Sequence, residues 1–254
     1  KTSWRVPQEV FNLAQRIIHK IPKNNRVQKE WRPREERGSV TEHYDISELQ
    51  NNLKTGEWLI LGRDKWRLNE LEEFLKDHNI YYERAKKNNP MKDKYAAIDL
   101  YENKLKKGKA LSYEECHEIK KKMLKNEWKP SLFKAMVKNK FYTMDMLKSD
   151  FGLNTDLPWQ AAFTRMGKND TDKINELIKK GEDLKNGARI KLATIHGVKG
   201  NERDNVVLSF KLSKACKDAY ITNPDDEHRV MYTGTTRTKN NLHIILGGEG
   251  DYDK

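Results

Sequence analysis

Residues 193–208, ATIHGVKGNERDNVVL, decide the fold. The stretch has the pattern of a strand, a polar loop that contains Gly197 and Gly200, and a second strand that starts at Asn205. A glycine-containing loop that leaves a parallel strand allows backbone amides to approach a phosphate group closely. The stretch therefore predicts an α/β fold with a phosphate-contacting loop.

Strands and helices alternate at both ends of the chain. Apolar runs predict strands at residues 39–44, 58–61, 80–83, 189–194, 205–210 and 242–246. Residues 8–19, 68–78 and 226–236 have apolar positions at helical spacing. This alternation predicts one parallel α/β domain, a sheet flanked by helices, formed by residues 1–84 together with residues 189–254.

The middle of the chain, residues 85–188, has a different character. It contains 23 Lys and Arg residues against 15 Asp and Glu, an excess of +8 out of +12 for the whole chain. Short helices are expected at residues 116–125, 130–137, 143–147, 158–166 and 172–180, the first preceded by a capping box of Ser112 and Glu115. We therefore expect a basic helical insert, and its charge favours nucleic acid ahead of an acidic membrane surface as the partner.

Composition argues against several classes of protein. Cys116 and Cys216 form no CxxC pair, which argues against a disulfide framework or a metal site and favours a reducing compartment. No run of about 18 apolar residues occurs, so no membrane-spanning segment is expected, and no membrane is expected among the partners. The chain starts without a methionine or a signal peptide. We expect a piece of a longer cytoplasmic protein in a bacterial or phage-like setting.

Three segments carry residues suited to chemistry. TSWRVP at residues 2–7 places an aromatic residue and an arginine before a helix, and YTGTTRTK at residues 232–239 places an arginine before the last strand. The strand, loop and strand at residues 193–208 form the third segment. Arginine offers a planar fork that suits phosphoryl oxygens, and an aromatic ring can stack on a base.

Together and in this order, the three segments resemble the later helicase motifs of the UvrD/Rep family, within superfamily 1. Residues 194–202 match the pattern T-I-H-x-x-K-G-x-E, and residues 232–237 match Y-x-x-x-T-R. Residues 4–7 read W-R-x-P where the family has Y-R-x-P, and residues 59–63 match a weaker segment in which a strand ends in an arginine. The insert lies outside the resemblance. Three positions depart from the family pattern: Asn201, Arg203 and Lys65.

The resemblance implies that the α/β domain is the second RecA-like domain of a motor and that the insert is its accessory domain. Arg5 and Arg237 would be catalytic arginine fingers that reach the γ-phosphate of ATP. Trp4 would stack on adenine, Gly200 would belong to the ATP-binding loop, and Glu202 would hydrogen-bond the ribose hydroxyls. The alternatives are that both arginines are surface or ion-paired residues and that Trp4 is a core aromatic.

The resemblance also implies that Arg63, Thr194 and His196 face single-stranded DNA, with a hydrogen-bonded structural role as the alternative for His196. In the insert, we predict that Lys120, Lys121 and Lys122 contact duplex phosphates, together with Lys104, Lys106, Lys107 and Lys109. The alternative is a solvated helix end, because acidic residues in the first turn and lysines in the last suit the helix dipole without any ligand.

The sequence contains no G-x-x-x-x-G-K-[ST] motif, and residues 225–228, DDEH, are interpreted as a helix start and not a D-E-x-H box. The resemblance implies ATP as the nucleotide. Because the cradle motif is absent, Mg²⁺ and the phosphate cradle are expected in a missing amino-terminal RecA-like domain of the same protein. This chain alone is expected to be inactive.

The favoured function is that of an ATP-dependent DNA helicase or translocase that acts on single-stranded DNA and duplex junctions. Its motif form resembles the 3′→5′ branch. Two alternatives remain open at this point. One is a basic DNA-binding or interaction module without ATPase chemistry, and the other is the motor arm of a helicase–nuclease.

Overall fold

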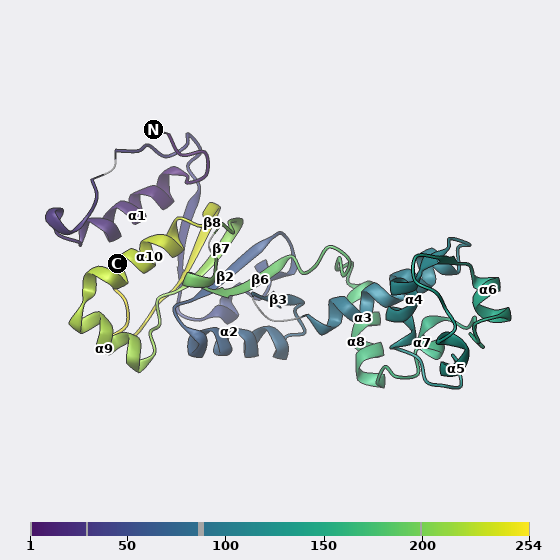
Figure 1. The fold of residues 1–254 in the computed structure, drawn as a ribbon. Coiled ribbons are helices and arrows are strands. Elements are labelled where there is room, and N and C mark those ends of the chain that lie inside the picture. Colours follow the sequence, from purple (N-terminus) through teal and green to yellow (C-terminus); the bar gives the residue numbers. More distant parts are fainter. Residues whose placement is uncertain (1, 29, 86–88, 199, 254) are drawn as a thin grey trace. The chain divides into compact units, whose positions relative to one another are not determined.

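The computed structural model describes residues 2–28, 30–85, 89–198 and 200–253. Two compact units form, one from Lys1–Asn88 with Ala188–Lys254 and the other from Asn89–Gly187 (Figure 1). We call them the sheet unit and the insert unit. The sequence predicts the two transitions after residues 84 and 188, close to these positions.

The sheet unit is built on six parallel strands in the spatial order β1-β8-β7-β2-β6-β3. The strands are β1 (Ser39–His43), β2 (Trp58–Gly62), β3 (Tyr82–Arg84), β6 (Ile190–Thr194), β7 (Arg203–Ser209) and β8 (Thr238–Ile245). The predicted α/β fold is confirmed, and the architecture is that of a RecA-like domain. Strand β8 starts four residues before the expected position, because its polar first half still pairs with β7, with Arg203 opposite Thr238.

Helices cover both faces of this sheet (Figure 1). They are α1 (Gln8–His19), α2 (Lys65–Asp77), α9 (Lys214–Thr222) and α10 (Pro224–Thr235). Leu59 and Leu61 of β2 pack in one core cluster with residues of α1 and α10, whereas Ile60 packs in a second cluster with residues of α2. Strand β2 is buried on both faces, as its apolar sequence predicts for a central parallel strand.

Two helices of the sheet unit differ from expectation. Helix α2 starts three residues early because the Asp64 side chain caps it, accepting a hydrogen bond from the Arg67 amide at 3.0 Å. Helix α9 is not predicted at all. None of its residues is fully buried, and only Cys216 and Tyr220 pack against the core, a contact too narrow for a sequence pattern to reveal the helix.

The insert unit consists of short helices and a two-stranded antiparallel ribbon. Its elements are α3 (Pro90–Ile98) with a π-helical extension (Asp99–Leu105), β4 (Leu111–Ser112), α4 (Tyr113–Lys120), α5 (Pro130–Phe133), β5 (Phe141–Tyr142), α6 (Met144–Ser149), α7 (Trp159–Ala162) and α8 (Lys168–Lys179). The capping box of Ser112 and Glu115 is confirmed, with hydrogen bonds of 3.3 and 2.9 Å. Helices α4, α5 and α7 end before their expected ends.

Among residues 2–28, 30–85, 89–198 and 200–253, none of the helices has the length and apolar character needed to span a bilayer. Over the same ranges, no cluster of three or more His, Cys, Asp or Glu side chains is arranged to ligate a metal ion.

Candidate functional site

The predicted site residues lie at two opposite edges of the sheet. Strands β7 and β8 start directly after Glu202 and Arg237, so these two residues lie at the amino-terminal edge. Strand β2 ends directly before Arg63 and strand β6 ends at Thr194, with Gly62 and Thr194 in register. Because all the strands run in the same direction, the second pair of positions lies at the carboxyl-terminal edge.

At the amino-terminal edge, Arg5 forms an ion pair with Glu202. Its Nη1 lies 2.7 Å from Oε2 of Glu202, and the two side chains are 34% and 32% exposed. The segment that carries Arg5 is fixed by Ser3, whose hydroxyl accepts hydrogen bonds from the amides of Arg5 and Val6 at 3.2 and 3.0 Å. The guanidinium is therefore positioned by local structure, although the ion pair itself is open to solvent.

Arg237 lies close to this pair. It follows α10, and its Nε donates a hydrogen bond to the Thr233 carbonyl at 3.3 Å. Burial lowers the pKa of Arg237, and the nearby positive charge of Arg5 lowers it further, while Glu202 opposes the shift. Arg5 alone contacts the Glu202 carboxylate, and Arg237 lies near enough for both charges to act on it. A further anion would stabilise two neighbouring guanidinium groups.

Trp4 is 95% exposed. The alternative that it is a core aromatic is therefore wrong. Trp4 directly precedes Arg5, and its ring is accessible to a planar ligand. Its predicted contact with adenine stays a prediction.

The loop after β6 combines a buried base with an exposed polar side. Ile195 and Val198 are buried in the turn Ile195–Val198, whereas His196 is exposed. His196 forms no hydrogen bond within the part of the chain that the structure describes, so the structural alternative has no support there. Gly200 has a φ of +84°, a conformation that side chains other than glycine rarely adopt. The motif residue Lys199 lies outside the described residues.

At the carboxyl-terminal edge, Arg63 is paired with Glu227 of α10. Nε of Arg63 lies 2.7 and 2.9 Å from the two carboxylate oxygens, and the side chains are 18% and 2% exposed. Burial alone would lower the pKa of Arg63, but the hydrogen bond and charge of Glu227 outweigh it and raise the pKa. The hydrogen bonds described for this guanidinium come from Nε, and Nη1 and Nη2 form none with the described residues.

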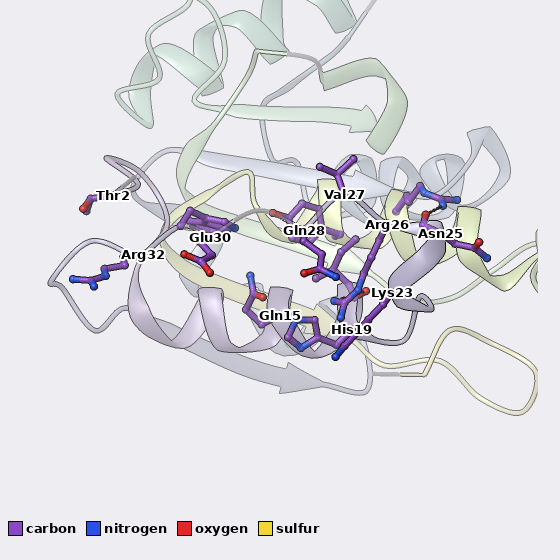
Figure 2. A pocket seen from close by; sticks show the side chains of 14 residues that line it. Thr2, Gln15, His19, Lys23, Asn25, Arg26, Val27, Gln28, Glu30 and Arg32 are labelled. Atoms are coloured by element: carbon purple, nitrogen blue, oxygen red, sulfur yellow. Dashed lines mark hydrogen bonds between the residues drawn. The ribbon is translucent and has the colours of Figure 1, made fainter.

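A pocket of about 940 Å³ lies beside α1 and α10. Figure 2 shows Thr2 and Arg32 at one end and Asn25 and Arg26 at the other. The described lining residues include four cationic side chains and one acidic side chain, Glu30. The cationic residues are Lys23, Arg26, Arg32 and Arg229. Tyr232 of the third motif also lines it, and the Ser3 amide donates to the Arg32 carbonyl at 2.7 Å, so the pocket adjoins the segment of Trp4 and Arg5. Its excess of cations favours an anionic ligand on this face.

Residues 159–248 match the family model of the UvrD-like helicase C-terminal domain. The chain carries a UvrD-like helicase C-terminal region. The predicted resemblance to the UvrD/Rep family is thereby confirmed. No curated protein matches the chain. The matched span starts at α7 and runs past β8, so it includes Glu202 and Arg237 but excludes Arg5 and Arg63.

In the insert unit, several of the predicted DNA-contacting lysines are already paired. Lys104 lies 2.5 Å from Glu115, Lys106 lies 3.1 Å from Glu102, and Lys121 lies 2.7 Å from Glu118. Burial and the nearby charge of Arg165 lower the pKa of Lys120. These contacts favour the alternative of a solvated helix end, and DNA binding by Lys120, Lys121 and Lys122 stays a prediction.

Sequence reasoning missed Glu227 as a partner of the helicase motifs. It was noticed only as part of an acidic helix start, and the structure confirms that position, since Asp225, Asp226 and Glu227 form the first turn of α10. The only available signal was an acid on the buried side of that turn. Nothing in the spacing could connect it with Arg63, because 164 residues separate the two.

Proposed function

We propose that this chain is the carboxy-terminal part of an ATP-dependent DNA helicase or translocase that moves 3′→5′. The observation that carries the proposal is the ion pair of Arg5 with Glu202 beside Arg237, whose carbonyl accepts a hydrogen bond from the Arg203 amide at 3.3 Å, in a chain with a UvrD-like helicase C-terminal region. A second RecA-like domain of the same protein would supply the phosphate cradle and Mg²⁺. The partner would be DNA.

The amino-terminal edge would bind ATP by an exchange of partners. The Glu202 carboxylate accepts a hydrogen bond from the Arg5 guanidinium at 2.7 Å and so occupies the position of an anion beside this arginine. When ATP binds, Glu202 would turn to the ribose hydroxyls, and the γ-phosphate would accept from Arg5 and Arg237. Both arginines would then stabilise the charge of the phosphoryl transition state.

Trp4 and Gly200 would complete the nucleotide contacts. Trp4 would stack on adenine, which fits a ring that is almost fully exposed. Gly200 would let the loop backbone approach the nucleotide, because its conformation leaves open space where a side chain would stand.

The carboxyl-terminal edge would contact single-stranded DNA. Arg63 and Thr194 stand at the ends of strands paired in register, and His196 is exposed in the following turn. The terminal nitrogens of Arg63 would reach a phosphate while Nε stays bound to Glu227, which fixes the direction of the guanidinium.

The test is DNA-stimulated ATP hydrolysis by the protein that includes the amino-terminal domain. Arg237→Ala should lower kcat by about 10³-fold, the low end of arginine-finger effects, and Arg5→Ala should also be severe. Arg37→Ala removes an exposed arginine that pairs with Glu9 and serves as the control. Near-normal kcat in both finger variants would contradict the proposal.

The direction of movement and the need for a second domain have tests of their own. A partial duplex with a 3′ tail should be unwound and one with a 5′ tail should not. The chain of residues 1–254 alone should show no DNA-stimulated hydrolysis. Turnover that survives purification and is lost in Arg237→Ala would contradict the view that another domain holds the phosphates.

A further inference from the structure

In the insert unit, residues 134–141, here called the basic loop, are fixed from below by buried side chains. The Tyr142 ring is buried, and its hydroxyl accepts a hydrogen bond from the Val137 amide and donates one to the Val137 carbonyl, both at 2.7 Å. Phe133 and Met136 are buried as well. A loop that is already ordered loses little conformational freedom when it binds a ligand.

The tip of the basic loop is a tight turn at Lys138 and Asn139. Asn139 has a φ of 64°, the left-handed conformation that asparagine tolerates better than most residues. Asn139 lies between Lys138, in the turn, and Lys140, which follows it, and both lysines are exposed. The two ammonium groups are thus presented on either side of one fixed turn.

Phe141 is 67% exposed although its neighbour Tyr142 is buried. The pairing of β4 with β5 explains the difference, because Tyr142 stands opposite the buried Leu111 while Phe141 stands opposite Ser112. Successive strand residues point to opposite faces, so the same ribbon that buries Tyr142 holds Phe141 in solvent. A single exposed aromatic is ordinary on a protein surface, but this one stands beside a concentration of positive charge.

Residues 128–144 contain four lysines and no acidic residue. Within the part of the chain that the structure describes, Lys134, Lys138 and Lys140 form neither an ion pair nor a side-chain hydrogen bond. This distinguishes them from Lys104, Lys106 and Lys121 in the same unit, each of which is paired with a glutamate. The charge of the basic loop is therefore available to an external anion.

We propose that the basic loop is a binding site for single-stranded DNA, with the Phe141 ring stacked on a base and Lys138 and Lys140 bound to flanking phosphates. Aromatic rings that alternate with cations are the features that bind single strands without sequence preference. The inference rests on the proposed function for the identity of the ligand. It assigns to the insert unit a contact separate from Arg63, Thr194 and His196 in the sheet unit.

Single-stranded DNA fits these features better than an acidic protein or a membrane does. A duplex keeps its bases stacked inside and offers no free face to Phe141. A membrane surface would favour an amphipathic helix with a long apolar face, whereas Phe141 lies on a two-residue strand. An acidic protein would use the lysines but would gain no stacking from the ring.

The first experiment measures binding of the chain to a labelled oligothymidine and to an abasic oligomer of equal length, by fluorescence anisotropy. Phe141→Ala should weaken oligothymidine binding by about 5- to 100-fold, the loss expected for one stacked base, and leave abasic binding unchanged. Phe141→Trp should retain affinity and Phe141→Leu should lose it. Leu157→Ala removes another exposed apolar side chain of this unit and is the matched control.

The second experiment removes the charges. Lys138→Ala with Lys140→Ala should make the slope of log K against log salt shallower by about 1.4, two phosphates on a single strand. Lys168→Ala with Lys179→Ala removes equal charge from exposed positions of α8 and should leave the slope unchanged. An unchanged slope in the loop variant would overturn the phosphate contacts.

The outcomes separate this inference from the proposed function. If Phe141→Ala binds oligothymidine normally while Arg237→Ala still abolishes ATP hydrolysis in the longer protein, the loop proposal fails and the proposed function stands. If Phe141→Leu retains full affinity for oligothymidine, the contact does not need an aromatic ring and the stacking proposal is overturned.

Discussion

The two arginine–glutamate pairs of the sheet unit differ in burial more than in geometry. Arg5 and Glu202 lie 2.7 Å apart with about a third of each side chain exposed, whereas Arg63 and Glu227 lie equally close with Glu227 almost completely buried. Solvent screens the first pair and leaves it worth about 1 kcal/mol or less. Breaking a buried pair costs about 3–5 kcal/mol, because one charge is left without a partner.

The difference in burial suits the two pairs to different roles. The Arg5–Glu202 pair can be exchanged for a ligand at little cost, which suits the edge where we propose that ATP binds. The Arg63–Glu227 pair connects the end of β2 to α10 and is suited to fixing the orientation of the Arg63 guanidinium.

The largest expected effect in this comparison is on stability. Glu227→Ala should lower the free energy of unfolding of the chain by about 3–5 kcal/mol, because Arg63, only 18% exposed, would be left without a partner. Glu202→Ala should change it by about 1 kcal/mol or less. Urea unfolding of both variants measures the contrast. Equal losses would show that the difference in burial has no energetic meaning.

A smaller effect is expected from Trp4, which stands beside the exposed pair. Trp4→Ala should raise KM for ATP in the longer protein by about 5- to 100-fold, the range for loss of one base–aromatic stack. It should leave the unfolding free energy unchanged, because the ring is exposed. The KM for a ribose triphosphate without a base is the control and should not move. An unchanged KM for ATP would remove Trp4 from the nucleotide site.

The pH dependence of stability gives a test at a histidine that belongs to neither pair. The unperturbed pKa of histidine, 6.5, lies above those of Asp and Glu, so its protonation begins at a higher pH. Burial, assisted by the nearby charge of His43, lowers the pKa of His243 to about 4 from an ordinary 6.5. The unfolded chain therefore takes up the proton first, and stability should fall as pH falls from 6.5 towards 4.

Unfolding in urea at several pH values checks this expectation. The wild-type chain should lose up to about 1 kcal/mol per pH unit across this window, and His243→Gln should give a flatter curve. His228 has a pKa lowered by burial in the same direction, so the variant should keep part of the slope. Parallel curves would contradict the assignment to His243.

The smallest effect is expected at a third pair, Lys121 with Glu118, in which both side chains are about half exposed. Lys121→Ala should change the unfolding free energy by less than about 0.5 kcal/mol. If Lys121 binds duplex phosphate, the same variant should make the salt dependence of duplex binding shallower by about 0.9. An unchanged salt slope with an intact fold leaves Lys121 as part of a solvated helix end.

The fold could be predicted where side-chain patterns are set by burial. The apolar run of β2 and the capping box at Ser112 are local signals, and each forms where it was expected. The first half of β8 was not predicted because its residues are polar and carry no apolar period. Helix α9 was not predicted because only Cys216 and Tyr220 pack against the core. Their positions depend on neighbouring elements that a local pattern does not contain.

The site residues divide in the same way. Arg5, Glu202 and Arg237 were chosen through a resemblance, and the structure brings them together. Glu227 could not be chosen, since its role depends on a contact with a residue that is distant in sequence. The pairing of Lys104 with Glu115 was hidden for a similar reason, because the sequence gives charge without giving the direction of side chains.

Helix α10 touches both edges of the sheet. Glu227 lies in its first turn, and Arg237 lies two residues after its last residue, Thr235. The helix covers about 12 Å along its axis between Glu227 and Thr235. Gly234 packs against Leu208 so closely that an added Cβ would lie 2.9 Å from a methyl carbon of Leu208, and the helix therefore rests directly on β7. A helix packed this closely on a strand has little room to bend. A displacement of Glu227 along the helix axis, transmitted from Arg63, would displace Arg237 by a comparable amount. Helix α10 would then couple motion at the carboxyl-terminal edge of the sheet to motion at the amino-terminal edge.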